Sequence, residues 1–299
     1  MHIITSQEMA KVSLDAAECV NWVHEAFLIK DRCQLPPKIS LHPRGIDFFN
    51  TMPCMLPEEY HTFGCKVVSR IKGNQPALKS ELMTFDTLTG EMTSLINADR
   101  ITAMRTGAVA ALAINTLRAR DTKIYGFIGL GIIARATLDC LLATNRNASM
   151  TIKLKRYKDQ AEKIISEYQK AYPNGNFVIV NTIEELISDS DVVVSCITEA
   201  DGILVNDTTL FKPGVLVVPV HTRGFQNCDT IFDKVFADDE GHVKGFKYFS
   251  QFRKFGELGK ILLGEIPGRE SNLERILSYN VGIGLHDIFF AYKIINSLS

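Results

Sequence analysis

The sequence predicts an α/β fold that combines a doubly wound parallel sheet with a second, smaller α+β domain. Three observations predict it: a glycine-rich turn follows an apolar segment at Gly129, strand-like and helix-like segments alternate from Thr122 onward, and short apolar or alternating runs fill the region between Leu35 and Asn97. Alternating strands and helices are typical of a parallel sheet with crossover helices, whereas short runs separated by turn residues are typical of an antiparallel sheet. We therefore expect one domain formed by residues 1–118 and 283–299, and another formed by residues 119–282.

The composition is that of an ordinary globular protein with a small-molecule partner. The chain has 299 residues, enough for two domains, and its 46% hydrophobic and 22% charged residues are typical of a soluble protein. A net charge of −1 without long runs of like charge argues against a nucleic-acid or membrane surface. The N-terminus has no secretion signal, so we expect a cytoplasmic protein. The seven cysteines lack metal-ligand spacing, and we interpret them as reduced thiols with no metal site.

The first domain is expected to open with a helix and continue as a sheet. Ser6 can cap a helix that runs to about Lys30, where apolar residues recur at helical spacing. A C-terminal helix is expected to pack back on this domain, because the sheet of the second domain is complete without it. The expected elements are strands over Phe63–Ser69, Leu82–Phe85 and Met92–Ile96, a tight turn over Asp86–Gly90 in which Gly90 takes a positive φ angle, and helices over Ala98–Arg118 and Gly282–Ser297.

The second domain is expected to repeat the order strand, turn, helix. A later stretch, Phe246–Arg269, interleaves aromatic and basic residues, which can bind single-stranded nucleic acid. Because the chain has no wider basic surface, we expect this stretch to be a helix that covers the sheet or lines a cleft. The other expected elements are strands over Lys123–Ile128, Met150–Leu154, Phe177–Val180, Val192–Cys196, Val215–Val220 and Lys234–Ala237, and helices over Ile132–Ala143 and Asp159–Tyr172.

The glycine turn has the residues and context of a dinucleotide-binding Rossmann motif. Gly129 permits a tight turn, Gly131 lets the backbone approach a phosphate, and Ala134 lets the helix pack closely on the strand. The motif follows an apolar strand and opens a helix, which is the context that this pyrophosphate site requires. We therefore expect Gly129, Gly131, Ile132, Ile133 and Ala134 to bind the cofactor.

The end of the next strand predicts which dinucleotide is bound. NAD-preferring sites carry an acidic residue there for the ribose hydroxyls, whereas this chain has Lys155 and Arg156. Arginine can pair a 2′-phosphate through two hydrogen bonds and stack on adenine. We therefore predict NADPH, with NAD(H) as the alternative.

Three further blocks give the chain a resemblance to a known family. They are Phe63–Lys66, Ile101–Ala108 and Phe127–Gly131, and their order and spacing resemble the ornithine cyclodeaminase/mu-crystallin family. The resemblance extends to Asp191–Ser195 and Val281–Asp287, and so spans nearly the whole chain. It implies a substrate-binding and dimerisation domain built from the N-terminal segment and the C-terminal helix, a Rossmann domain in the middle, and a homodimer.

The resemblance also implies roles for individual residues. Lys66 is similar to the family's active-site lysine, and a desolvated lysine can have a lowered pKa and act as an acid or base. Arg105 resembles an arginine that binds the substrate carboxylate or the pyrophosphate, and Lys38 stands where the family often has an arginine for that carboxylate. The dinucleotide contacts implied by position are Thr106, Thr198, Val220 and Asn280.

One departure from the family pattern bears on the reaction. Family cyclodeaminases carry an aspartate after the strand predicted at Val215–Val220, and the ungapped placement puts Arg223 in its position. Arginine cannot act as a base at neutral pH but suits a carboxylate or phosphate. His221 lies at the carboxyl end of the same strand, and two interpretations stay open for it: a proton carrier or a hydrogen-bonded structural histidine.

The sequence thus leaves three functional hypotheses. The first is an NADPH-dependent oxidoreductase that reduces an imine formed from an amino acid or keto acid, or dehydrogenates an amino acid. The second is a cyclodeaminase that recycles tightly bound NAD and releases ammonia. The third is a non-catalytic ligand-binding protein of the crystallin type. The absent aspartate favours the first over the second, and Lys66 favours the first over the third.

Overall fold

The chain folds into two compact units. The structure is a computed structural model that describes residues 1–197, 202–221, 225 and 228–298. One unit comprises Met1–Arg105 and Gly282–Ser299, and the other comprises Thr106–Val281. The chain passes from the first unit to the second within the long helix α3 (Asp99–Leu117).

The first unit is built on a six-stranded sheet with the strand order β1-β6-β5-β4-β3-β2. Neighbouring strands are antiparallel, except that β1 pairs with β6 in parallel. The sheet confirms the antiparallel region expected from the sequence, and Gly90 takes the expected positive φ of 75° in the turn after β5. The elements of this unit are β1 (His2–Ile4), α1 (Ser6–Met9), α2 (Ala16–Ile29), η1 (Lys30–Arg32), β2 (Ile39–Leu41), β3 (Phe48–Met55), η2 (Glu58–Tyr60), β4 (Thr62–Arg70), β5 (Leu78–Asp86), β6 (Met92–Asn97) and α8 (Gly284–Leu298).

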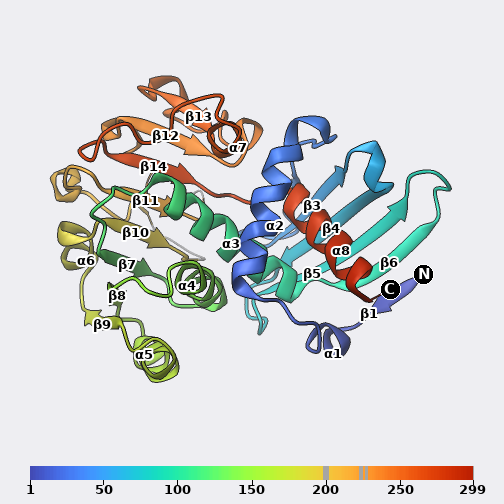
Figure 1. The fold of residues 1–299 in the computed structure, drawn as a ribbon, viewed down its shortest axis with the longest axis horizontal. Coiled ribbons are helices and arrows are strands. Elements are labelled where there is room, and N and C mark those ends of the chain that lie inside the picture. The colour runs from blue at the N-terminus through green and yellow to red at the C-terminus, as the bar shows by residue number, and fades with distance from the viewer. Residues whose placement is uncertain (198–201, 222–224, 226–227, 299) are drawn as a thin grey trace. The chain divides into compact units, whose positions relative to one another are not determined.

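Helices α2 and α8 lie side by side on one face of this sheet (Figure 1). Trp22 of α2 and Phe290 of α8 pack edge to face, with ring centroids 5.1 Å apart. Along β4 every second side chain is buried, which is the period of a strand with one covered face. Lys66 occupies one of these buried positions, so the strand register directs its side chain into the interior of the unit.

The N-terminal helix expected from Ser6 to Lys30 is wrong in its continuity and its cap. Thr5, rather than Ser6, caps the short helix α1 through a reciprocal capping box with Glu8. The chain then turns, and the Asp15 side chain accepts a hydrogen bond from the backbone N–H of Glu18 to start α2. Asp15 is therefore a second capping residue that starts a separate helix, whereas the apolar periodicity alone predicts a single continuous helix.

The second unit is a parallel sheet with the strand order β13-β12-β14-β11-β10-β7-β8-β9 (Figure 1). All seven strand pairs are parallel, which confirms the α/β class predicted from the sequence. The chain starts in the middle of the sheet at β7, proceeds outward to β9, and returns to lay β10 on the other side of β7. This reversal is the topological switch point at which such sheets bind ligands, outside the carboxyl ends of the strands.

The elements of the second unit agree with the expected alternation and add one central strand. This strand, β14, follows a turn-rich segment and is not among the strands that the sequence predicts. The strands and α-helices are β7 (Ile124–Ile128), α4 (Ile132–Thr144), β8 (Met150–Lys155), α5 (Gln160–Ala171), β9 (Gly175–Val180), α6 (Ile183–Asp189), β10 (Val192–Ser195), β11 (Leu216–Pro219), β12 (Lys234–Ala237), β13 (Phe255–Glu257), α7 (Leu258–Leu262) and β14 (Ile276–Tyr279). The 3₁₀ turns are η3 (Thr208–Leu210), η4 (Asp229–Ile231), η5 (Glu240–His242) and η6 (Phe249–Gln251).

The helix expected over Phe246–Arg269 is not formed. The segment contains η6, the edge strand β13 and the short helix α7. Phe249 packs on Phe252 and Phe255 with ring centroids 5.3 and 5.0 Å apart, and Phe246 packs on Tyr279 at 5.1 Å. Pairing of β13 with β12 satisfies backbone hydrogen-bonding groups at the sheet edge, and the aromatic side chains pack on the apolar core. The segment thus satisfies its backbone groups and buries its apolar side chains without forming a continuous helix.

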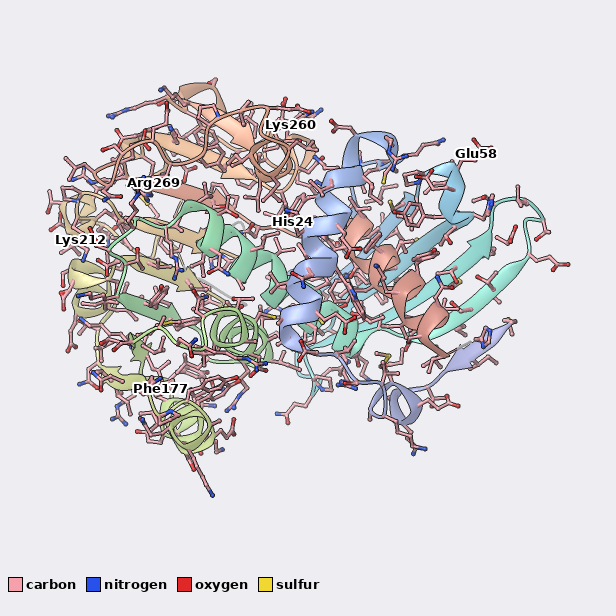
Figure 2. All side chains as sticks on the ribbon, viewed as in Figure 1. His24, Glu58, Phe177, Lys212, Lys260 and Arg269 are labelled. Atoms are coloured by element: carbon pink, nitrogen blue, oxygen red, sulfur yellow. The ribbon has the colours of Figure 1, made fainter. Side chains whose placement is uncertain are left out.

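Arg269 fixes the end of α3 within the second unit. Its Nε donates to the carbonyl oxygen of Leu117 at 2.6 Å, and its side chain is marked in Figure 2. The terminal carbonyls of a helix have no partner within the helix, so this bond satisfies one of them. Among the described residues, no helix combines the length and the apolar character needed to cross a membrane.

Candidate active site

The glycine turn predicted to bind a dinucleotide connects β7 to α4. Gly129 has a φ angle of 78°, and a Cβ atom there would lie 2.7 Å from the backbone nitrogen of Ile197, so the turn requires glycine. A Cβ atom at Gly131 would meet no atom within 4 Å. Ala134 is fully buried, as close packing of helix on strand demands. The turn therefore combines a tight backbone at the switch point with open space at the helix start.

The start of α4 offers hydrogen-bond donors to an anion. Its N-cap residue is Gly131, and no side chain of the described residues caps the helix there. The first N–H groups of a helix have no partner within it, and the helix dipole favours negative charge at this end. Ile132 is largely exposed and Ile133 is half-buried beside this end. The predicted pyrophosphate position is thus chemically suited to a phosphate group.

Asn280 presents an unpartnered acceptor at the same edge of the sheet. It follows β14, is almost fully buried, and donates from Nδ2 to the carbonyl of Ser278 at 3.0 Å. Its Oδ1 has no hydrogen-bond partner among the described residues. The backbone N–H of Asn280 donates to Pro219, and that of Val220 donates to Ser195, each at 3.0 Å. A buried acceptor without a partner fits a ligand that brings an N–H group, such as the carboxamide of a nicotinamide ring.

His221 is held by a residue that sequence reasoning missed. Its Nε2 lies 2.6 Å from the Oγ atom of Ser195, which ends β10 and is fully buried. The ring also stacks on Phe225, with centroids 6.1 Å apart. The hydrogen bond to Ser195 orients the imidazole and leaves both interpretations of His221 open. The register of two neighbouring parallel strands creates this pair, and Ser195 carries no local signal of it.

Lys155 and Arg156 lie at the end of β8, as the cofactor prediction requires. Arg156 is exposed and forms an ion pair with Glu162 from α5, and its Nε donates to Asn181 at 3.2 Å. Lys155 donates to the backbone carbonyl of Arg156 at 3.1 Å. The basic pair is thus available at the surface, with the guanidinium shared with an acidic neighbour.

Lys66 and Arg105 converge on one carboxylate in the first unit. The Nζ atom of Lys66 donates to Oδ1 of Asp287 at 2.8 Å, and Nε of Arg105 donates to the same oxygen at 2.9 Å. Lys66 and Asp287 are fully buried, and Arg105 is 5% exposed. Lys66 also donates to the hydroxyl of Thr102 at 3.4 Å, one turn of α3 before Arg105. We call Lys66, Arg105 and Asp287 the ionic cluster.

Burial and neighbouring charges lower the pKa of Lys66 to about 7. Desolvation is the largest cause, and the positive charges of Arg105 and Lys38 act in the same direction, while Asp287 raises the pKa. Lys38, which is half-buried, therefore lies within electrostatic reach of Lys66. A lysine with this pKa exists in both protonation states near neutral pH and suits proton transfer.

Asp287 was missed although its signal is visible. It is an isolated acidic residue in a helix whose neighbours Leu285, Ile288 and Phe289 are buried and apolar. A buried carboxylate in such surroundings needs a cationic or hydrogen-bonding partner. That rule predicts that Asp287 has a partner, but no local sequence pattern identifies the partner as Lys66 or Arg105.

The predicted site residues fall into two groups, one in each unit. Lys38, Lys66 and Arg105 belong to the first unit, and the dinucleotide residues belong to the second. Thr106, half-buried in α3, is the first residue of the second unit. Thr198 and Arg223 lie outside the described residues.

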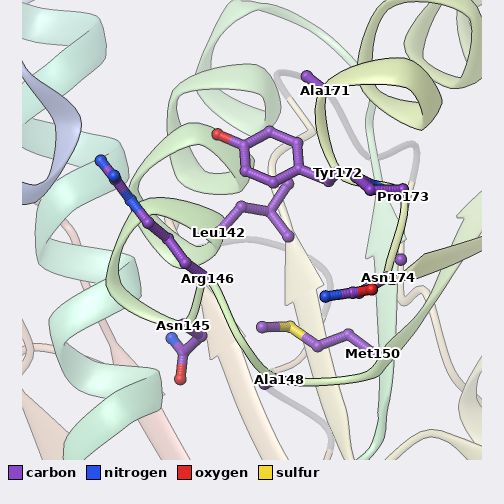
Figure 3. A pocket seen from close by; sticks show the side chains of 10 residues that line it. Leu142, Asn145, Arg146, Ala148, Met150, Ala171, Tyr172, Pro173 and Asn174 are labelled. Carbon is purple, nitrogen blue, oxygen red and sulfur yellow. The ribbon is translucent and has the colours of Figure 1, made fainter.

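A separate pocket in the second unit is not at the dinucleotide edge. It has a volume of about 290 Å³ and is lined by residues that include Leu142, Arg146, Met150, Tyr172 and Asn174 (Figure 3). Met150 and Gly175 begin β8 and β9, so the pocket lies at the amino ends of these strands. The glycine turn lies at the carboxyl end of β7, which is the opposite edge of this parallel sheet.

Comparisons with known proteins place this arrangement in a family. The family model described as the ornithine cyclodeaminase/mu-crystallin family matches residues 1–299. The nodulation efficiency protein NfeD of Rhizobium meliloti is 26% identical over 95% of this chain and 91% of its own length. A Δ1-pyrroline-2-carboxylate reductase of Bacillus thuringiensis is 27% identical over 78% of this chain and 77% of its own length.

A solved structure shows the same fold. The Δ1-pyrroline-2-carboxylate reductase of Thermococcus litoralis, solved in complex with NADH and L-proline, superposes with a TM-score of 0.86 at 23% identity and covers 100% of this chain and 98% of its own. The name of the Bacillus thuringiensis relative, a reductase, agrees with the predicted oxidoreductase class. The family model matches the full length, and the chain belongs to the ornithine cyclodeaminase/mu-crystallin family.

Proposed function

We propose that this protein is a nicotinamide-dependent imine reductase whose substrate carries a carboxylate next to the reacting carbon. The observation that carries the proposal is the ionic cluster, in which a buried lysine and a buried arginine share Asp287. Two cations against one carboxylate leave a positive interior that a substrate carboxylate can balance. The names of the similar reductases support the same reaction class.

Each candidate site residue of the first unit has a defined role in the proposed reaction. The bond to Asp287 uses Nε of Arg105, so its Nη1 and Nη2 can pair the two oxygens of a substrate carboxylate. Lys38 adds a second positive charge for the same anion. Lys66 as an ammonium group donates a proton to the imine nitrogen while the imine carbon receives a hydride, so that the C=N bond becomes a CH–NH bond. In the reverse direction the neutral amine of Lys66 takes the proton back.

The second unit is proposed to hold the cofactor. The N–H groups at the start of α4 and the space beside Gly131 fit a pyrophosphate, and Oδ1 of Asn280 fits a carboxamide N–H. When bound, a reduced nicotinamide supplies the hydride. Lys155 and Arg156 favour NADPH, with NAD(H) as the alternative. Thr106, Ile132, Ile133, Thr198 and Val220 are proposed as further cofactor contacts, His221 as a second proton carrier and Arg223 as a substrate contact.

The test is a stoichiometric assay with carboxylate-bearing imines. Δ1-Pyrroline-2-carboxylate supplies a cyclic imine, and a 2-keto acid with ammonia supplies an acyclic one. We expect loss of reduced nicotinamide absorbance matched by the amine formed, and loss of this activity in Lys66→Met. Ammonia release from ornithine without net cofactor change would instead identify a cyclodeaminase, and ligand binding without turnover would identify a binding protein.

We also propose a cytoplasmic homodimer that contacts its partner through the first unit. Strand β2 ends the sheet, and Ile39, Leu41 and Phe49 on β2 and β3 are exposed. Exposed apolar residues gathered at one sheet edge are typical of a surface that another chain covers. Light scattering would give the mass in solution, and Leu41→Lys is expected to shift it towards the monomer. A wild-type monomer would contradict this proposal.

A further inference from the structure

Asp287 occupies a buried position in α8, where a carboxylate costs desolvation free energy but is stabilised by its location near the helix N-terminus. The residue is fully buried, and α8 is otherwise strongly apolar on this face. It stands in the first turn of the helix, where the helix dipole favours a negative charge. A buried carboxylate is tolerated only with close cationic or hydrogen-bonding partners. The cost of burying Asp287 is therefore offset by its bonds to Lys66 and Arg105, which apolar packing does not supply.

Two glycines let α8 bring Asp287 to the sheet. A Cβ atom at Gly64 of β4 would lie 2.6 Å from Cδ1 of Ile288, and one at Gly284 would lie 2.9 Å from the carbonyl oxygens of Met52 and Pro53. Larger residues at either position would push the helix away from the strands. The close approach sets Asp287 between Lys66 of β4 and Arg105 of α3.

Lys66 and Arg105 share a single oxygen of Asp287, and this fixes the geometry of the ionic cluster. One oxygen, Oδ1, accepts from both Lys66 and Arg105, at 2.8 and 2.9 Å, while Oδ2 has no hydrogen-bond partner among the described residues. Both cations are therefore tied to a single point, and their spacing follows from it. A carboxylate that only neutralised charge could distribute its two oxygens, one to each cation.

We propose that Asp287 is a positioning residue that fixes the Lys66 ammonium and the Arg105 guanidinium at one spacing, so that a carboxylate-bearing imine meets both at once. This inference rests on the proposed imine reduction. In the proposed substrate the imine carbon carries both the imine nitrogen and the carboxylate, so the two groups are held at a fixed short distance, and productive proton transfer needs both in place together. Asp287 sets the spacing of the two cations without touching the substrate.

Asp287 also favours the protonated form of Lys66, which burial and the neighbouring positive charges disfavour. Among the described residues, the charged groups that act on the pKa of Lys66 are Arg105 from α3, Lys38 before β2 and Asp287 from α8, and of these only Asp287 favours the ammonium form. His286, the neighbour of Asp287, is fully buried and held neutral, because burial and the charges of Arg105, Lys30 and Lys66 lower its pKa. Without Asp287, nothing in this group opposes the loss of the Lys66 proton.

The experiment compares Asp287→Asn with the wild type by two readouts. The first is the Lys66 titration, followed by nuclear magnetic resonance of isotope-labelled lysine and assigned with Lys66→Met. The second is the pH profile of kcat/KM for imine reduction. We expect the Lys66 pKa in Asp287→Asn to fall by about one unit or more, the profile to shift by the same amount, and KM for the imine to rise about tenfold. An unchanged Lys66 pKa in a folded Asp287→Asn would overturn the inference.

Asp287→Glu separates positioning from charge, and it replaces the first variant if Asp287→Asn does not fold. Glutamate keeps the negative charge but moves it by one methylene. We expect a Lys66 pKa close to that of the wild type with kcat lowered about tenfold or more, because the spacing changes. Wild-type kinetics in Asp287→Glu would refute the positioning role. If the wild type reduces no imine, the proposed function fails, whereas the Lys66 titration still decides whether Asp287 holds the ammonium form.

Discussion

Gly282 lies against the guanidinium of Arg105. A Cβ atom at Gly282 would lie 2.3 Å from Nη1 and 3.1 Å from Nη2 of Arg105, and Gly282 has a φ angle of 83°, which only glycine adopts readily. The segment that leads into α8 thus supplies both sides of the arginine site: Gly282 makes room for the guanidinium, and Asp287 accepts its Nε hydrogen.

We expect Gly282→Ala to weaken binding of a carboxylate substrate. The added methyl group would displace the terminal nitrogens of Arg105, which are proposed to pair the carboxylate, so KM should rise about tenfold or more while the Lys66 titration changes little. Steady-state kinetics with the imine substrate measures this change.

The matched control is Gly90→Ala. Gly90 has a similar φ angle of 75° in the same unit, but a Cβ atom there would meet nothing within 4 Å. It therefore imposes similar backbone strain without touching Arg105. Equal effects of the two variants on KM would show that strain, rather than contact with Arg105, is responsible.

The pH dependence of the reaction should follow Lys66. Its pKa is lowered to about 7, and imine reduction needs its protonated form, so kcat/KM for reduction should fall as the pH rises through that value. Amine oxidation needs the neutral form, so kcat/KM in that direction should rise over the same range. Binding of a substrate carboxylate near Arg105 favours the ammonium, so kcat for reduction should decline at a higher pH than kcat/KM.

His221→Asn is the control for this assignment. The variant removes the second proposed proton carrier and should leave the profile of kcat/KM in place, whereas Lys66→Met should abolish it. Loss of the profile in His221→Asn, with Lys66→Met still pH-dependent, would assign the proton to the Ser195–His221 pair instead.

The sequence predicted those parts of the fold that local chemistry determines. The alternation along β4 and the glycine turn before α4 depend on neighbouring residues, and both appear where expected. The break between α1 and α2 depends on Asp15 acting as a cap, which competes with a continuous apolar period. Local signals therefore identify an element more reliably than they place its ends.

The candidate site shows the same limit: local patterns can identify single residues but not their distant partners. Lys66 could be singled out from a short resembling block, but the bond to Asp287 joins residues 221 positions apart. Similarly, the hydrogen bond between Ser195 and His221 requires the register of β10 and β11. Contacts of this kind follow from the packing of distant elements, so no local pattern contains them.

Cofactor choice can be tested at the end of β8. If Arg156 binds a 2′-phosphate, Arg156→Ala should weaken NADPH binding about tenfold or more and change NADH binding little. Fluorescence titration with both dinucleotides measures the two affinities. The expected loss is moderated by Glu162, which already shares the guanidinium.

Arg146→Ala serves as the matched control for Arg156. Arg146 is an exposed arginine in the same unit that lines the pocket at the amino ends of β8 and β9 (Figure 3). Its loss changes the net charge equally without reaching the predicted ribose position. An equal loss of NADPH affinity in both variants would indicate a general charge effect, and unchanged affinity in Arg156→Ala would argue for NAD(H).

A buried acid in the second unit should make stability depend on pH. Burial raises the pKa of Asp229 to about 6, and the hydrogen bond from the Tyr279 hydroxyl at 2.5 Å opposes this rise. An unfolded aspartate has a pKa of about 3.9, so between these values the folded state binds more protons than the unfolded state. The free energy of unfolding should therefore fall as the pH rises from about 4 to 6, with the full penalty present above that range.

Asp229→Asn should remove this pH dependence. Urea unfolding of both proteins at about pH 5 and about pH 8 should show the variant gaining about 1 kcal/mol relative to the wild type at the higher pH. Tyr279→Phe removes the hydroxyl that holds the pKa of Asp229 down, so it should raise that pKa and extend the decline to higher pH. Asn and Asp have nearly the same shape, so a stability difference between the variant and the wild type that is the same at both pH values would come from the changed hydrogen bonding of the side chain. Such a result would contradict titration of Asp229.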